Sequence, residues 1–160
     1  MVRILFVCHG NICRSPIAEF VMKDLAAREG VSDQLYIESA ATSSEEIWGG
    51  RGNPVYPPAR KILKEHGIDC GGKRAYQMQR SDYGRFDMLI GMDSENLWNM
   101  RRMTGDDPDG KISLLLDYTD RPGDVADPWY TGDFRATWRD VTEGCAGLMR
   151  YLKEKGLVRS

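Results

Sequence analysis

The sequence lacks any long hydrophobic run and any strong excess of charge of one sign. No apolar segment among its 160 residues approaches the roughly 20 residues that cross a membrane, so we expect no membrane association. The formal net charge of −2 gives no broad basic field, so nucleic acid is not an expected partner. The apolar N-terminal stretch is short and has no cleavage-site pattern, which excludes a signal peptide and predicts a cytoplasmic protein.

Histidines and paired cysteines are also scarce. The chain has two histidines and four cysteines, at positions 8, 13, 70 and 145, with no Cys-x-x-Cys. This spacing fits neither a compact disulfide framework nor a zinc ribbon. We therefore expect reduced thiols and no metal site.

What the chain has is an alternation of short apolar runs with amphipathic helical patterns. Strands are expected at residues 2–7, 35–39, 87–92 and 112–116, and helices at 16–28, 58–66, 93–103 and 134–152, with a helical turn at 81–85. Strands separated by helices indicate a parallel sheet with right-handed crossovers. We predict one α/β domain over residues 1–160, a three-layer, doubly wound, four-stranded parallel sheet with helices on both faces.

The segment Val7–Pro16 joins the first expected strand to the first helix. Ser15 and Pro16 have the chemistry of a helix start, with Ser15 as the N-cap. The preceding loop therefore aims backbone N–H groups at one point, which makes an anion site. Cys8 begins this loop and Arg14 ends it. A curled loop would bring both side chains to one anion, where Arg14 binds two phosphate oxygens and the N–H groups stabilise a Cys8 thiolate. A nucleophile beneath a bound phosphate indicates a phosphatase.

The residues between the cysteine and the arginine suit such a loop. Gly10 fits where the backbone approaches an anion closely, and Asn11 tolerates a left-handed backbone better than other non-glycine residues. The expected phosphate-binding loop consists of His9, Gly10, Asn11, Ile12, Cys13, Arg14 and Ser15.

Cys-x-Gly-Asn-Ile-Cys-Arg-Ser-Pro at residues 8–16, followed much later by Asp127-Pro128-Trp129-Tyr130, resembles the low-molecular-weight protein tyrosine phosphatase family. The stretches 39–43, 66–68 and 86–93 extend the resemblance over nearly the whole chain. It implies that Cys8 forms a phosphocysteine, that Arg14 binds the phosphate, and that Asp127 acts as general acid and then general base. The expected fold is phosphotyrosine phosphatase I-like, and no metal or organic cofactor is implied.

The resemblance also implies roles for supporting residues. The Ser15 hydroxyl would hydrogen-bond the nucleophilic sulfur, and Asn11, braced by Ser39 and His66, would fix the loop. Cys13 would trap the oxidised nucleophile Cys8 as a reversible disulfide, which protects it from further oxidation.

Large aromatic residues in loops are candidates for substrate-pocket walls. Trp48, Trp129 and Tyr130, together with Ile12, would form a slot deep enough for phosphotyrosine and too deep for phosphoserine. The loop around Trp48 departs from the family's usual length. The expected partner is a protein that carries phosphotyrosine, which for bacterial members is often a tyrosine kinase, with inorganic phosphate as product.

Three other aspartates lie near the expected site. We expect Asp93, which follows the third strand, to cap a helix or to order the site rather than to catalyse. Asp120 and Asp124 are expected to be solvated charges in the loop before Asp127.

Three alternatives bear on the function. An arsenate reductase on this scaffold needs a further cysteine pair after the third strand, and the absence of cysteine between Cys70 and Cys145 counts against it. Arginine phosphatases of the family carry threonine at the position of Ile12, and an apolar side chain there fits a phenyl ring better. A non-catalytic phosphate-binding module needs neither a thiolate nor an acid. The sequence therefore favours a tyrosine phosphatase.

Overall fold

The computed structural model describes residues 1–160 and contains every strand and helix expected from the sequence. In chain order the elements are β1 (Val2–Cys8), α1 (Arg14–Arg28), η1 (Ser32–Gln34), β2 (Leu35–Ala41), β3 (Ile47–Trp48), β4 (Arg51–Gly52), α2 (Pro57–Glu65), α3 (Asp82–Arg85), β5 (Met88–Gly91), α4 (Ser94–Met103), β6 (Ile112–Leu114), η2 (Leu115–Tyr118), α5 (Pro128–Thr131) and α6 (Phe134–Glu154). No helix is both long and apolar enough to span a bilayer.

The main sheet has the strand order β2-β1-β5-β6, and every pair in it is parallel. The central strand β1 pairs with β2 from Val2↔Leu35 to Cys8↔Ala41 and with β5 on its other side. Residues 4–7 of β1 are fully buried, as expected of a parallel strand that is covered on both faces. This confirms the predicted four-stranded parallel sheet.

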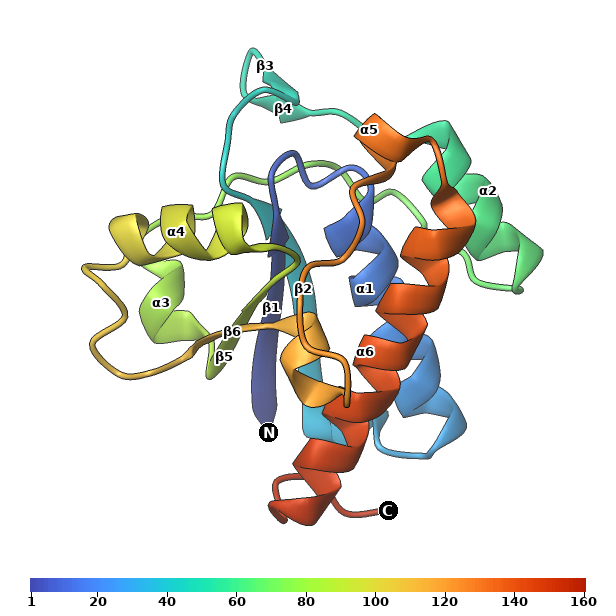
Figure 1. Ribbon diagram of the computed structural model, residues 1–160, viewed down its shortest axis with the longest axis vertical. Helices are drawn as coiled ribbons and strands as arrows, with labels where there is room; N and C mark the ends of the chain where they lie inside the picture. The colour runs from blue at the N-terminus through green and yellow to red at the C-terminus, as the bar shows by residue number, and fades with distance from the viewer.

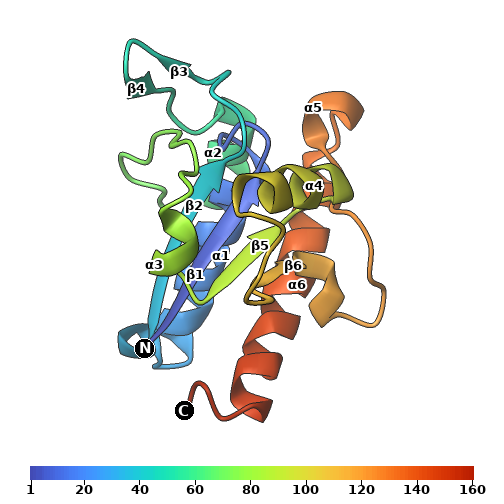
Figure 2. The same ribbon diagram turned by 90° about the vertical axis from the view of Figure 1, so that its left-hand side faces the viewer.

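Helices cover both faces of this sheet, as Figures 1 and 2 show: α1, α2 and α6 lie on one side, and α3 and α4 on the other. Alternating side chains of β1 supply the two cores. Ile4 and Phe6 face α1 and α6, whereas Leu5 and Val7 face the layer of α3 and α4. Cys8 continues the first set, so it ends β1 on the side from which α1 begins.

The structure differs from the expectations in four places. The fourth strand ends at Leu114, and Leu115 and Leu116, which were expected in it, belong to η2. Helix α1 begins two residues early, with Cys13 as its N-cap, so Ser15 lies inside the first turn and is not the cap. The 40–57 segment contains a two-residue antiparallel hairpin, β3–β4, and the loop before α6 contains the short helix α5. Both are too short to leave a periodic pattern in the sequence.

Candidate active site

The loop between β1 and α1 lies at the carboxyl end of the parallel sheet, where open α/β folds bind ligands (Figure 1). Cys8 begins it, and its side chain is almost fully buried. The backbone N–H of Asn11 donates to Cys8 Sγ at 3.3 Å, and Ser15 Oγ lies 3.0 Å from the same sulfur. Two polar groups thus already face the sulfur, as expected where a thiolate is to be stabilised.

Asn11 holds the curled shape of this loop. Its backbone is left-handed, with φ 60°, and its side chain is buried. Asn11 Nδ2 donates to Ser15 Oγ at 2.8 Å and to Ser39 Oγ at 2.9 Å. Its Oδ1 accepts from the backbone N–H of Tyr76 at 3.0 Å. The bracing predicted for Ser39 is present, and the amide ties the loop to β2 and to the 73–78 segment.

The bracing predicted for His66 is absent. This histidine follows α2, where its Nδ1 lies 2.9 Å from the Ile62 carbonyl oxygen one helical turn earlier. Its ring stacks on Trp138 of α6, with the centroids 4.1 Å apart. His66 therefore joins α2 to α6, and the backbone of Tyr76 provides Asn11's third contact.

A buried carboxylate that sequence reasoning missed lies behind Ser39. The Ser39 hydroxyl donates to Glu19 Oε1 at 2.5 Å, and Glu19 Oε2 pairs with Lys23 at 2.6 Å. Lys73 donates to the Ser39 carbonyl at 2.8 Å and lies 3.6 Å from Glu19. Burial lowers the pKa of Lys73 although the Glu19 charge opposes that shift. Nothing in the local sequence separates Glu19 from an ordinary helical glutamate.

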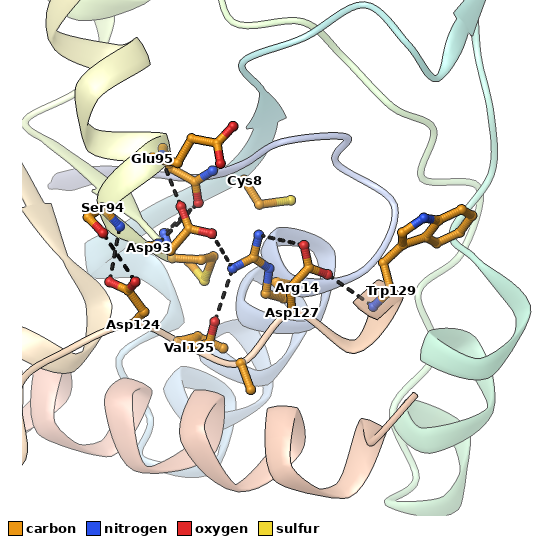
Figure 3. Close-up of polar contacts among 12 residues, drawn as sticks. Cys8, Arg14, Asp93, Ser94, Glu95, Asp124, Val125, Asp127 and Trp129 are labelled. Carbon is orange, nitrogen blue, oxygen red and sulfur yellow. Dashed lines mark hydrogen bonds and ion pairs between the residues drawn. The ribbon is translucent and has the colours of Figure 1, made fainter. Parts of the chain in front are cut away.

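Arg14 is buried and surrounded by acceptors (Figure 3). One of its terminal nitrogens donates to Asp93 at 2.8 Å and to the Val125 carbonyl at 3.0 Å, and the other donates to Asp127 at 3.3 Å. Burial opposes the charge of the guanidinium, but the negative groups of Cys8, Asp93 and Asp127 together raise the pKa of Arg14 above its ordinary value. Arg14 therefore remains protonated and positively charged in the site.

Asp93 fulfils both expectations stated for it. One carboxylate oxygen accepts from the backbone N–H of Asn96 at 2.8 Å and caps α4, in a capping box completed by the Asn96 side chain. The other oxygen holds Arg14. A single carboxylate thus links the start of α4 to the phosphate-binding loop.

Asp127 lies on the opposite side of Arg14 from Asp93, in the segment that leads into α5 (Figure 3). Its Oδ1 accepts from the backbone N–H of Trp129 at 3.0 Å and caps α5, while its Oδ2 faces Arg14. The carboxylate is about a quarter exposed, with a side-chain exposure of 27%. It is held in place and still open to the pocket.

Asp124 is not the purely solvated charge that the sequence suggested. Its carboxylate is exposed but accepts from Ser94 N at 3.0 Å and from Ser94 Oγ at 3.1 Å (Figure 3). It therefore docks the loop that carries Asp127 onto the N-terminus of α4, where the helix dipole favours a negative charge. Asp120 forms no such contact.

These groups border a cavity of about 460 Å³. Cys8 and the loop up to Arg14 form its base, and Ile12, Trp129 and Tyr130 provide apolar wall, as predicted. Three glutamates that were not predicted as site residues also line it, namely Glu45, Glu46 and Glu95. Glu45 Oε2 also lies 2.9 Å from His9 Nε2.

Trp48 does not line this cavity. It lies on the β3–β4 hairpin, which projects from the top of the molecule in Figure 1, and its side chain is 73% exposed. Gly49 and Gly50, both with positive φ, form the turn that follows the tryptophan, and Glu45 and Glu46, which precede the hairpin, line the cavity.

The four cysteines are free and buried. Burial, reinforced by the negative groups of Cys8 and Asp127, raises the pKa of the Cys13 thiol to about 12. Cys13 is therefore protonated at neutral pH. Cys145 lies on the buried face of α6 in the core, as expected, and burial raises its pKa as well.

The fold and this site define a class: α/β proteins with a cysteine-to-arginine anion loop at the carboxyl edge of a parallel sheet. The chain belongs to the low molecular weight phosphotyrosine protein phosphatase family, whose model matches residues 3–158. It is 39% identical over 160 residues to the low molecular weight protein-tyrosine-phosphatase YfkJ of Bacillus subtilis, covering 98% of this chain and 100% of the relative. A family member from Rattus norvegicus is 37% identical over 151 residues, covering 91% of this chain and 92% of the relative.

Solved structures agree with this assignment. The crystal structure of YfkJ matches with a TM-score of 0.91 at 37% identity, covering 97% of this chain and 96% of that one. A Drosophila arginine phosphatase matches with a TM-score of 0.84 at 28% identity, covering 94% of this chain and 97% of that one. The predicted family and fold are confirmed.

Proposed function

We propose that this chain hydrolyses phosphotyrosine in proteins through a phosphocysteine formed on Cys8. One observation carries the proposal: Arg14 contacts the Asp127 carboxylate at 3.3 Å in the cavity whose base is Cys8. A phosphate seated on the loop would then lie between nucleophile, cation and acid. The names of the relatives support the same substrate class.

In the first step the Cys8 thiolate attacks phosphorus in line. The P–S bond forms as the P–O bond to tyrosine breaks, and protonated Asp127 delivers its proton to the leaving oxygen. Arg14 and the loop N–H groups stabilise the negative charge on the equatorial oxygens of the transition state. The hydrogen bond to Ser15 stabilises the thiolate both before attack and after the phosphoryl group leaves.

In the second step Asp127, now a carboxylate, removes a proton from water. That water attacks phosphorus, the P–S bond breaks, phosphate is released, and Cys8 is again a thiolate. Every electron pair and proton in this cycle comes from Cys8, Asp127 and water, so the proposal requires no metal or organic cofactor.

We favour tyrosine over arginine as the phosphorylated residue. Ile12 gives the cavity wall an apolar side chain with no hydrogen-bonding group, which suits a phenyl ring better than a polar phosphoguanidine group. Arginine phosphatase is the alternative, since the Drosophila arginine phosphatase has the same fold. The substrate would be a cytoplasmic phosphotyrosine protein, a tyrosine kinase among the candidates.

We also propose a redox role for Cys13. Peroxide would oxidise Cys8 to a sulfenic acid, and the Cys13 thiol would then displace water from it to form a disulfide. A cellular thiol would reduce this disulfide and restore the enzyme.

The proposed function is tested with p-nitrophenyl phosphate, phosphotyrosine peptide and phosphoarginine, in the presence of chelator and reductant. We expect wild type to hydrolyse the first two, Cys8→Ser to be inactive, and Asp127→Asn to lose about 10²–10⁴-fold in kcat. Absence of turnover in freshly reduced wild type would refute the phosphatase proposal, and a preference for phosphoarginine would transfer it to the alternative substrate.

A further inference from the structure

A second hollow adjoins the candidate active site. It is a groove of about 690 Å³ between α2 and the segment that precedes it. Its floor is apolar and includes Val55 and Tyr56, while Arg60, Lys61 and Lys64 of α2 contribute three cations. None of the chemistry proposed above uses this groove.

The three cations are placed there by the packing of α2. Ala59, Ile62 and Leu63 are buried against the core, so the opposite face of the helix is exposed. Residues 60, 61 and 64 lie on that face. Lys61 and Lys64 are three residues apart, which is less than one helical turn. None of the three forms an ion pair within the chain. Their charges are therefore available to a bound partner.

The groove is continuous with the catalytic cavity. Ile12 and Glu46 line both. Tyr56 of the groove also packs against Trp129 of the cavity, with ring centroids 5.3 Å apart. Figure 1 accordingly places α5, which carries Trp129, beside the start of α2. A polypeptide whose phosphotyrosine occupies the cavity would pass directly into the groove.

The cavity and the groove differ in charge. Glu45 and Glu95 line the cavity but not the groove, and both would repel an acidic segment of substrate. The groove holds three cations against a single carboxylate, Glu46, which contacts Asn53 at 3.5 Å. An acidic segment is therefore attracted to the groove and not to these glutamates of the cavity.

We propose that the α2 groove is a substrate-docking subsite that selects phosphotyrosines flanked by aspartate or glutamate residues. This inference rests on the proposed phosphotyrosine phosphatase activity and specifies which sequences that activity prefers. Arg60, Lys61 and Lys64 provide the charge recognition, and the apolar floor accommodates the peptide backbone.

The test compares two phosphotyrosine peptides that differ only in their flanks, Asp and Glu in one and Asn and Gln in the other. We expect wild type to favour the acidic peptide by about 3- to 30-fold in kcat/KM, as two or three exposed ion pairs provide. The gain should appear in KM, because the contact is equally strong in ground state and transition state. It should vanish at roughly 1 M salt, where screening extends over a few ångströms.

The decisive variant replaces Arg60, Lys61 and Lys64 by glutamine. We expect the ratio of its kcat/KM values for the acidic and the amide peptide to fall to about one. A general loss of activity affects both values equally and cancels in this ratio. The matched control replaces three exposed cations at the far end of the molecule, Arg150, Lys155 and Arg159, by glutamine and should keep the wild-type ratio. No acidic preference in wild type, or the same preference in the α2 variant, would overturn the groove assignment while leaving the phosphatase intact. Absence of p-nitrophenyl phosphate turnover in wild type would overturn both.

Discussion

At the scale of the residue, the cavity depends on side chains that do two things at once. Asn11 adopts a left-handed backbone and joins two serines and the Tyr76 backbone through one amide. Asp93 caps a helix with one oxygen and holds Arg14 with the other. Replacement of either residue would therefore disturb local backbone and site electrostatics together.

Cys13 provides a prediction with a defined pH dependence. Its thiol has a raised pKa of about 12, so below that pH only a small fraction is thiolate, and that fraction rises about tenfold per pH unit. We expect iodoacetamide to label Cys13 in the native protein very slowly at pH 7 and progressively faster toward pH 9. Mass spectrometry of the labelled sites, with urea-unfolded protein as the control, measures this.

The Cys8→Ser variant keeps this readout specific, because it removes the neighbouring thiol. A Cys13 labelling rate that stayed constant between pH 7 and pH 9 would contradict a raised pKa. Such a result would mean that Cys13 is already largely a thiolate at pH 7.

Residues could be predicted where one local segment determines their role. Cys8, Arg14 and Asn11 lie in one loop whose curled form follows from its own composition. His66 was expected at the loop but stacks on Trp138 of α6. Trp48 was expected in the cavity wall but precedes the Gly49-Gly50 turn of the hairpin. Neither position follows from a local sequence pattern. Glu19 was missed for the same reason, since its partners Ser39 and Lys73 are distant in sequence.

At the scale of the element, the loop between η2 and α5 positions the candidate acid. The Val125 N–H donates to the Met92 carbonyl at 2.8 Å, and Thr137 of α6 donates to the Ala126 carbonyl at 2.9 Å. Asp124 adds a charged contact to Ser94 at the start of α4. The loop is thus fixed from both sides of the sheet just before Asp127.

Removal of the Asp124 contact should misplace the acid. We expect Asp124→Ala to lower kcat for phosphotyrosine by up to about 100-fold, the loss that a misplacement of roughly 1 Å can cause. The loss should be smaller for p-nitrophenyl phosphate, because a better leaving group depends less on protonation. Steady-state kinetics with both substrates measures the difference.

Asp120→Ala is the matched control, since it removes an exposed carboxylate of the same loop that forms no hydrogen bond or ion pair within the chain. It should leave both kcat values unchanged. Equal losses for the two substrates in Asp124→Ala would show that the contact supports folding rather than placement of the acid.

Helices and strands of ordinary length could be predicted from the sequence, and the shortest elements could not. Amphipathic helices and buried strands leave periodic patterns, so α1, α4, α6 and the four parallel strands were expected. The β3–β4 hairpin and α5 each form from a few residues whose conformation depends on what they pack against. The hairpin carries Trp48, the one expected wall residue that lies outside the cavity.

At the scale of the whole molecule, the parallel sheet brings distant segments to one edge. The carboxyl ends of β1 and β5 deliver Cys8 and Asp93, while α6 holds the loop that carries Asp127 (Figure 2). Because α6 lies across η2, its close packing there supports both the core and the site. Helix α6 and η2 approach each other most closely at two glycines of α6, Gly144 and Gly147.

Gly147→Ala tests how much the whole fold depends on that approach. An added Cβ would lie 2.1 Å from the carbonyl oxygen of Tyr118, so α6 or η2 must shift. In an open helix this change would stabilise by about 1 kcal/mol. Here we expect a net loss of about 1–3 kcal/mol, typical of overpacking, and a fall in Tm of about 2–4 °C for each kcal/mol.

Gly84→Ala is the control, because Gly84 lies in the exposed part of α3 with no atom within 4 Å of an added Cβ. It should leave Tm unchanged or raise it slightly. If Gly147→Ala behaved in the same way, α6 would have room to move off η2. Rigid packing of α6 would then not be what positions the loop that Thr137 contacts. The distance between Asp127 and Arg14 would instead depend on the Asp124–Ser94 and Val125–Met92 hydrogen bonds alone.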